Sequence, residues 1–300
     1  MHAACVAGET SEPSDLPHGA GGRIMAAMMQ RRKFGSLGRE VGVIGQGTWQ
    51  LGRDRAGPIA ALRRGLELGM DHIDTAEMYT GAEEVIAEAF AGRRDEIFLV
   101  SKVLPQNASR KGTLAACEQS LRRLRTDHLD VYLLHWRGSH PLAETVAAFE
   151  ELERAGKIRA WGVSNFELDD LEEFAALAPA GRPVCNQVLY HLEERSIEPD
   201  VVPWCESRAV AVVGYTPFGG SRFPGPRSAG GRVLEEVAAA HGATPRQIAL
   251  AFLARGAPLF AIPKAARVQH AEENARAGAI ALSAAEITRI DAAFGSARRG

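Results

Sequence analysis

Short apolar runs alternate with longer segments of helical periodicity through most of the chain. The runs expected to be strands cover residues 43–44, 72–73, 98–101, 131–134, 158–163, 184–188, 210–213 and 259–262. Amphipathic segments after the first five of them cover residues 58–68, 82–90, 111–124, 141–155 and 168–177. Strands that alternate with helices of this length form a parallel sheet, and eight such units predict an α/β fold, the (β/α)8 TIM barrel.

Additional elements flank the predicted barrel at both ends. Residues 32–34 and 40–43 enclose a Gly-Ser-Leu-Gly turn, which predicts an N-terminal β-hairpin. Extra helices near the C-terminus are expected over residues 233–240, 244–254 and 284–294, with one more starting near Val268. Residues 45–49, Gly-Gln-Gly-Thr-Trp, lack the third glycine of a dinucleotide-binding fingerprint, so a Rossmann domain is disfavoured.

The first 28 residues differ in composition from the rest. They are rich in small, polar and acidic residues without periodicity, which predicts a disordered tail before a domain over residues 29–300. The interpretation of this segment as a tail makes Met25, Met28 and Met29 candidate start sites. The chain ends a few residues after the last predicted helix, so we expect no long C-terminal loop over the substrate pocket.

Charge and composition exclude several classes of function. The formal net charge is −2 and no basic face is evident, so a nucleic-acid partner is not expected. No run reaches the roughly 18 apolar residues of a membrane helix, and no signal-peptide core is present. The 4 cysteines contain no CxxC pair, which predicts no zinc site and no disulfide framework. We expect a cytoplasmic protein, a monomer, without a metal.

Ionisable side chains follow three neighbouring predicted strands. Asp74 and Tyr79 follow the second strand, Lys102 ends the third and His135 ends the fourth. Carboxyl ends of barrel strands meet at one rim, where active sites lie. Each residue alone has an ordinary structural explanation, such as a helix cap, a solvated loop residue, a core histidine or a rim aromatic. Together they could form one site, because an ammonium held by a carboxylate lowers a nearby phenol's pKa.

Several motifs resemble those of the aldo-keto reductases. Ile-Asp-Thr-Ala-Glu-Met-Tyr at residues 73–79, Leu-Leu-His-Trp at 133–136 and the segment 156–165 carry the similarity, which extends over residues 34–274. Within the family, Gln-Gly-Thr-Trp at 46–49, residues 185–191 and Ile-Pro-Lys-Ala at 262–265 look most like the bacterial methylglyoxal-reductase type.

The resemblance implies a nicotinamide cofactor extended across the barrel mouth. Ser164, Asn165 and Gln187 would bind the carboxamide, Tyr215 would stack on the nicotinamide, and Lys264 would face a 2′-phosphate. The residues so assigned to the cofactor, NADPH, are Gly47, Thr48, Asp74, Ser164, Asn165, Gln187, Tyr215, Lys264, Ala265, His270, Glu273 and Asn274. His270 replaces a frequent arginine and Ala265 a frequent serine, and both changes would weaken phosphate recognition.

The resemblance predicts NADPH-dependent reduction of small aldehydes, with 2-oxoaldehydes such as methylglyoxal as the favoured class. Tyr79 would donate the proton, Lys102 would lower the Tyr79 pKa, Asp74 would keep Lys102 charged and His135 would orient the carbonyl. Trp49 and Trp136 would line the substrate pocket together with Tyr79 and His135. Two alternatives remain open: a reductase of sugar-derived ketones or keto acids, and a cofactor-binding regulatory protein with little turnover.

Overall fold

The computed structural model describes residues 28–52 and 55–295. The predicted tail, residues 1–28, lies outside the described residues except for Met28. Within the described part of the chain, the barrel and its additional elements extend from Arg31 to Phe294.

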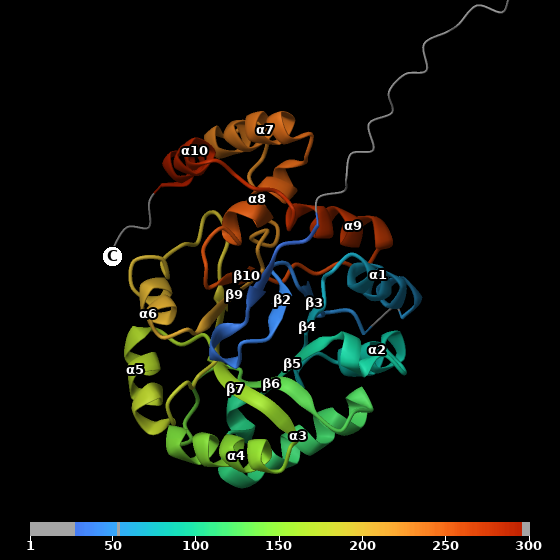
Figure 1. The fold of residues 1–300 in the computed structure, drawn as a ribbon, viewed down its shortest axis with the longest axis vertical. Helices are drawn as coiled ribbons and strands as arrows, with labels where there is room; N and C mark the ends of the chain where they lie inside the picture. The colour runs from blue at the N-terminus through green and yellow to red at the C-terminus, as the bar shows by residue number, and fades with distance from the viewer. Residues whose placement is uncertain (1–27, 53–54, 296–300) are drawn as a thin grey trace, which may run out of the picture.

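Eight parallel strands of the described chain form the central sheet, in the order β10-β9-β8-β7-β6-β5-β4-β3. Their bounds are β3 Gln46–Gly47, β4 His72–Asp74, β5 Phe98–Val103, β6 Leu129–Leu134, β7 Ile158–Ser164, β8 Cys185–Leu189, β9 Ala211–Tyr215 and β10 Leu259–Ala261. Parallel bridges from Ile44 to Ala261 and from Gly47 to Lys264 join the first strand to the last. The sheet closes on itself, which confirms the predicted (β/α)8 barrel (Figure 1).

Helices surround this barrel, and most of them match the predicted segments to within a few residues. Their bounds are α1 Ala56–Glu67, α2 Ala82–Ala89, α3 Arg110–Leu124, α4 Leu142–Arg154, α5 Leu168–Leu177, α6 Val201–Ser207, α7 Ala229–His241, α8 Pro245–Leu253, α9 Val268–Ala277 and α10 Ala284–Phe294. Short 3-10 turns cover Gly35–Leu37, Arg94–Glu96 and Pro105–Asn107. Helix α6 was not predicted as a segment, because seven residues give too few turns for a periodic pattern.

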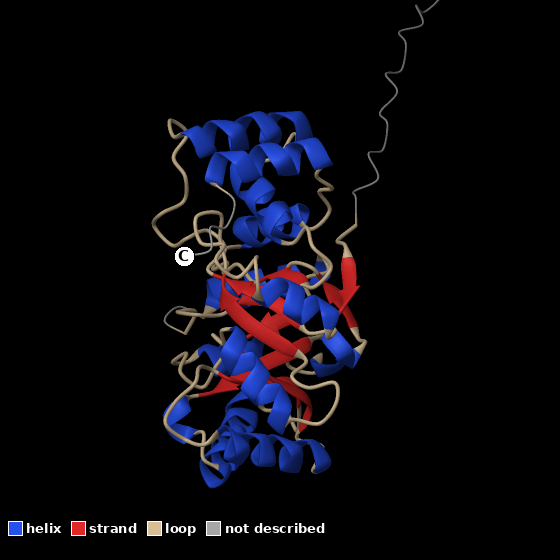
Figure 2. Cartoon of the chain, turned by 90° about the vertical axis from the view of Figure 1, so that its left-hand side faces the viewer, coloured by secondary structure: helices blue, strands red, loops and turns tan. Residues whose placement is uncertain are grey.

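Helix α7 begins four residues before the predicted start. Ser228 caps it by accepting a hydrogen bond from the backbone N–H of Gly231, at 3.0 Å. Gly230 and Gly231 in the first turn are poor helix formers, so the sequence pattern placed the start too late. Helices α7 and α10 pack on each other beside α8, at the top of Figure 2.

Side-chain alternation along the strands sorts residues between the barrel interior and the layer beneath the helices. In β5, Phe98 and Val100 belong to the interior cluster, whereas Leu99 and Val103 pack under the helices. Lys102 has the same parity as Phe98 and Val100, so it points along the barrel axis above them. The same alternation directs Asp74 inward at the end of β4 and Gln187 inward in the middle of β8. These inward side chains near the C-terminal ends of the strands lie beside one another in a single site.

An antiparallel hairpin of β1 (Arg31–Lys33) and β2 (Glu40–Gly42) covers the opposite, N-terminal end of the barrel (Figure 1). The predicted N-terminal hairpin is thus confirmed. Phe34 follows β1, is fully buried, and contacts the rings of His72, Phe98 and Phe260 at centroid distances of 5.4, 4.7 and 5.3 Å. This ring fills the N-terminal end of the barrel interior, which is called the barrel floor below. Among the described helices, none is long and apolar enough to cross a membrane.

Candidate active site

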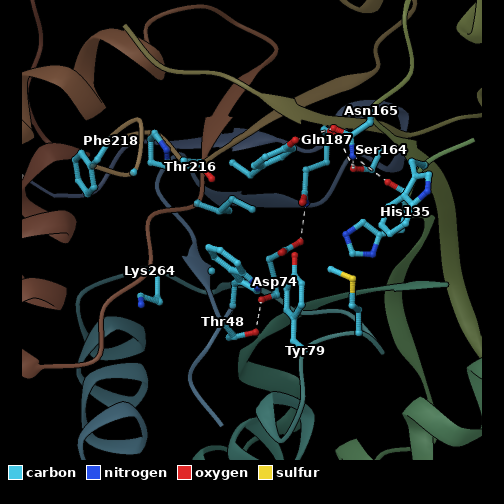
Figure 3. Close-up of a pocket in the computed structure, with 18 of the residues that line it drawn as sticks. Thr48, Asp74, Tyr79, His135, Ser164, Asn165, Gln187, Thr216, Phe218 and Lys264 are labelled. Atoms are coloured by element: carbon cyan, nitrogen blue, oxygen red, sulfur yellow. Dashed lines mark hydrogen bonds between the residues drawn. The ribbon is translucent and has the colours of Figure 1, made fainter. Parts of the chain in front are cut away.

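A cavity of about 610 Å³ lies at the C-terminal ends of the barrel strands (Figure 3). Its wall is formed by residues of β3, β4, β7, β8 and β9, by the segments after β3, β4, β6, β7, β9 and β10, and by one residue of α8. The wall consists of Gly47, Thr48, Trp49, Asp74, Met78, Tyr79, His135, Trp136, Ser164, Asn165, Gln187, Tyr215, Thr216, Pro217, Phe218, Gly220, Arg246, Ile262 and Lys264. Most residues that the sequence assigned to catalysis, cofactor and substrate therefore share one cavity.

A buried ion pair lies beneath this cavity: Asp74 belongs to the wall, whereas Lys102 lies behind it and is not a wall residue. The Lys102 Nζ donates hydrogen bonds to Asp74 Oδ1 and to the carbonyl oxygen of Thr75, both at 2.7 Å. The side chains of Lys102 and Asp74 are 0% and 2% exposed. Burial by itself would lower the pKa of Lys102, but the Asp74 carboxylate together with smaller contributions from Tyr79 and Cys185 outweighs it, and the net pKa is raised. Lys102 is therefore a fixed ammonium, and Asp74 is the group that keeps it charged.

The second carboxylate oxygen of Asp74 is also held. Gln187 Nε2 donates to Asp74 Oδ2 at 2.6 Å, and the Thr48 hydroxyl donates to the backbone carbonyl of Asp74 at 2.8 Å. Buried charges are tolerated when their remaining hydrogen-bonding capacity is satisfied. Gln187 from β8 therefore fixes the orientation of the carboxylate against Lys102, and Thr48, directly after β3, holds the backbone that carries it.

Tyr79 lies above this pair in the turn between β4 and α2. Lys102 Nζ is 5.2 Å from the centroid of the Tyr79 ring, and the His135 ring is 5.9 Å from it. Glu77 anchors the same turn to the end of β5, because its Oε1 accepts hydrogen bonds from the Leu104 N–H at 2.6 Å and from Asn107 Nδ2 at 3.0 Å. The position of the phenol relative to Lys102 is thereby set by the β5 loop.

The electrostatics of Tyr79 differ from the expectation drawn from the sequence. Burial raises the pKa of Tyr79, and the opposing effect of Lys102 is smaller, so the net direction is upward. The predicted lowering by Lys102 exists as one contribution but does not determine the sign. At neutral pH Tyr79 is therefore a protonated phenol with an ammonium nearby.

His135 is a neutral imidazole in this site. Burial, with a further contribution from Lys102, lowers the pKa of His135 to about 3. Its Nδ1 is buried without a hydrogen-bond partner among the described residues, and its backbone carbonyl accepts from Asn165 Nδ2 at 3.0 Å. Because it is uncharged at neutral pH, His135 can donate or accept a hydrogen bond but cannot be a proton source.

The chain is similar in sequence and in fold to proteins of known family. A family model described as Aldo/keto reductase family matches residues 43–294. The chain belongs to the aldo/keto reductase family. The methylglyoxal reductase YeaE of Escherichia coli K12 is 46% identical over 256 residues, which are 84% of this chain and 90% of that protein. The glyoxal reductase of Bacillus subtilis is 33% identical over 77% of this chain and 82% of its own length.

Solved aldo/keto reductase structures agree with this assignment. One from Klebsiella pneumoniae in complex with NADP and acetate has a TM-score of 0.84 and 42% identity, covering 91% of this chain and 98% of that chain. A second from the same organism in complex with NADPH has a TM-score of 0.83 and 43% identity, covering 90% of this chain and 97% of its own.

Polar groups at one side of the aldo/keto reductase cavity already bind one another. Asn165 Nδ2 contacts the Ser164 hydroxyl at 3.2 Å, and Asn165 Oδ1 accepts from the Tyr215 hydroxyl at 2.9 Å. Asn165 and Thr216 adopt left-handed backbone angles, with φ of 58° and 53°, which are uncommon for non-glycine residues. A carboxamide ligand would have to exchange with some of these hydrogen bonds.

The opposite end of the cavity contains fewer of the predicted residues. Lys264 lies in the wall, and a Cβ at Gly47 would approach the carbonyl oxygen of Ile262 to 2.8 Å, so glycine is required there. Four residues that were assigned to the cofactor are not in the wall and lie on or just before α9: Ala265, His270, Glu273 and Asn274. His270 is exposed and Asn274 is buried.

Some wall residues were not assigned a role from the sequence. They are Met78, Thr216, Pro217, Phe218, Gly220, Arg246 and Ile262. The glycine- and proline-rich loop after β9 was a visible signal for some of them. No sequence signal identified Arg246 as a wall residue, because a single arginine in the first turn of a helix is typical of a protein surface.

Proposed function

We propose that this protein reduces small aldehydes with NADPH, and that 2-oxoaldehydes such as methylglyoxal are its substrate class. The observation that carries the proposal is the buried Asp74–Lys102 pair beneath a protonated Tyr79, with a neutral His135 on the same cavity. Similarity to a methylglyoxal reductase and a glyoxal reductase supports the substrate class. Complexes of similar structures with NADP and NADPH support the cofactor.

The proposed chemistry divides between cofactor and protein. When bound, NADPH supplies a hydride for the carbonyl carbon. As negative charge develops on the carbonyl oxygen, the phenol of Tyr79 transfers its proton to that oxygen, and the electron pair of the broken O–H bond stays on the tyrosine. Lys102 stabilises the resulting phenolate by its nearby positive charge. The raised pKa of Tyr79 keeps the phenol protonated before the reaction, as reduction requires.

His135 has a separate part in this proposal. With a pKa of about 3 it carries no proton to donate as an acid near neutrality. A neutral imidazole still has one N–H, which can bind the carbonyl oxygen and hold it toward Tyr79. The proposed roles therefore rest on pKa shifts in opposite directions. The raised pKa of Tyr79 keeps the phenol protonated as the acid, and the lowered pKa of His135 leaves a neutral imidazole that orients the carbonyl.

The chemistry of the wall fits the proposed cofactor. Ser164, Asn165 and Gln187 offer donors and acceptors for a carboxamide, and Tyr215 offers an aromatic face. Lys264 is a cation for phosphate at the other end. The proposed cofactor contacts also include three further residues that line the same cavity, Gly47, Thr48 and Asp74. Residues on α9 and just before it complete the proposed set: Ala265, His270, Glu273 and Asn274.

Large apolar side chains surround the proposed substrate entrance. Trp49, Met78 and Trp136 are 55%, 42% and 36% exposed, and all three line the cavity. Exposed apolar groups at a pocket mouth are typical of ligand sites. An open aromatic rim suits a small carbonyl compound that needs little enclosure.

The decisive test replaces Tyr79 with phenylalanine. Removal of the acid is expected to lower the rate of methylglyoxal-dependent NADPH oxidation by about 10²- to 10⁴-fold. NADPH affinity, measured by calorimetry without a carbonyl compound, should stay at the parent value. Near-normal turnover by Tyr79→Phe would contradict the proposed mechanism, and a panel with sugar-derived ketones and keto acids would rank the substrates of the parent enzyme.

We also propose that the protein works as a monomer in the reducing cytoplasm. Cys117, Cys185 and Cys205 are buried and unpaired, which is compatible with that compartment. Beyond the three residues at the pocket mouth, the large exposed apolar side chains of the described chain are Met28, Leu177, Leu189 and Val268. Size-exclusion chromatography with light scattering would test this proposal, and a stable dimer would refute it.

A further inference from the structure

Two cationic side chains are present in the described cavity wall, Lys264 and Arg246. Asp74 is the acidic residue of the same wall, and Lys102 already neutralises it. Figure 3 places Phe218 and Lys264 at the end of the cavity away from His135, on different sides of it. That end therefore carries uncompensated positive charge.

Arg246 is held at this end by aromatic rings. Its guanidinium carbon lies 4.9 Å from the centroid of Phe218 and 4.5 Å from that of Phe223. Within the described residues it has no ion pair and no side-chain hydrogen bond, in contrast to most arginines of the protein. Stacking holds a guanidinium plane while leaving its N–H groups at the edge free for an anion.

The backbone under Arg246 is also fixed. It occupies the first turn of α8, where Thr244 and Gln247 form a capping box. Gln247 Nε2 donates to the carbonyl oxygen of Glu273 at 2.9 Å, which ties α8 to α9. Arg246 is therefore a cation in a fixed position on the cavity wall, and its guanidinium N–H groups have no hydrogen-bond acceptor among the described residues.

We propose that Arg246 binds a phosphate of the dinucleotide and that Phe223 positions it for this contact. The inference rests on the proposed use of NADPH. A phosphate fits because a guanidinium offers paired donors that match two phosphate oxygens. NADPH carries phosphate groups at two places, the pyrophosphate and the 2′-phosphate. Lys264 and Phe218 lie on different sides of this end of the cavity, so Lys264 alone would leave the Phe218 side without a cation. Arg246, which lies over the Phe218 ring, supplies the cation on that side.

The test measures NADPH and NADH affinity of the full-length protein by calorimetry, without a carbonyl substrate. Arg246→Met keeps the length of the side chain and removes the charge. Loss of one charge-assisted contact should raise the NADPH Kd by about 10- to 100-fold. Arg276→Met is the matched control, because Arg276 is exposed at the last turn of α9 and lies outside the cavity wall. It should bind NADPH as the parent does.

The NADH experiment identifies which phosphate is bound. An equal loss of affinity for both cofactors assigns Arg246 to the pyrophosphate, whereas a loss confined to NADPH assigns it to the 2′-phosphate. An Arg246→Met variant that binds both cofactors as tightly as the parent overturns the proposal. A parent protein that binds NADPH without reducing any carbonyl would contradict the proposed function while leaving this inference testable.

Phe223→Leu tests the positioning role, because Phe223 contacts Arg246 without lining the cavity. Loss of one cation–π contact should raise the NADPH Kd by about 2- to 5-fold in the parent. The same substitution in the Arg246→Met background should have no effect, since the group it positions is gone. Equal effects in both backgrounds would show that Phe223 acts on the cofactor site independently of Arg246.

Discussion

A buried histidine far from the catalytic rim should determine how this protein loses stability in acid. His72 is fully buried on the barrel floor, and neither ring nitrogen has a partner among the described residues. The Phe34 and Phe98 rings meet it edge-on, at 5.4 and 5.6 Å. Burial lowers its pKa from 6.5 to about 4. The folded protein therefore holds a neutral imidazole in an apolar layer.

The sign of the effect follows from linkage. Below its ordinary pKa the unfolded His72 binds a proton that the folded form rejects, so acid favours the unfolded state. The stability contribution is complete above pH of about 6.5 and is lost as the pH falls toward about 4. This lowering of the His72 pKa corresponds to a stability contribution of about 3 kcal/mol at neutral pH. By pH of about 5 the free energy of unfolding has lost about 2 kcal/mol of that contribution.

The assay compares the parent with His72→Leu, which is of similar size and does not titrate. Free energies of unfolding from urea titrations at pH of about 7.5 and 5 give the acid loss of each protein. The parent should lose about 2 kcal/mol more than His72→Leu, because contributions from other groups, His135 among them, cancel in the difference. His270→Leu, at an exposed position on α9, should behave as the parent. Equal acid losses in the parent and His72→Leu would refute the reasoning.

Two further changes test the barrel at its two ends. Lys102→Met leaves the Asp74 carboxylate buried without its ammonium, so the free energy of unfolding should fall by about 3–5 kcal/mol and turnover should disappear. A urea titration would show it, and an unchanged midpoint would argue against a strongly coupled pair. Phe34→Ala opens the barrel floor and should lower stability by about 3–5 kcal/mol while the Michaelis constant for the aldehyde stays unchanged. If Phe34→Ala altered the Michaelis constant at constant turnover, packing at the barrel floor would affect substrate binding, and the prediction would be wrong.

The strand ends show how far the sequence alone determines this site. The period of two along a strand and the single rim of a parallel barrel were sufficient to bring Asp74, Lys102 and His135 together. Each of them ends a short apolar run, and the carboxyl ends of all strands meet at one edge. The same motif placed Tyr79 a few residues after Asp74 at this edge, whereas its position over Lys102 depends on the contacts of Glu77 with the loop after β5.

Tertiary structure decided the properties that depend on several segments at once. The Tyr79 pKa rises because burial by the assembled cavity outweighs one ammonium, and no local pattern states how deeply a side chain will be buried. Gln187 holds Asp74 from a strand 113 residues away. Arg246 reaches the cavity because the capping box of α8 and two rings from a separate loop converge on it. Short-range periodicity specifies the direction of a side chain within its own element. Its partners, burial and charge environment arise from contacts distant in the chain, which only the folded barrel brings together.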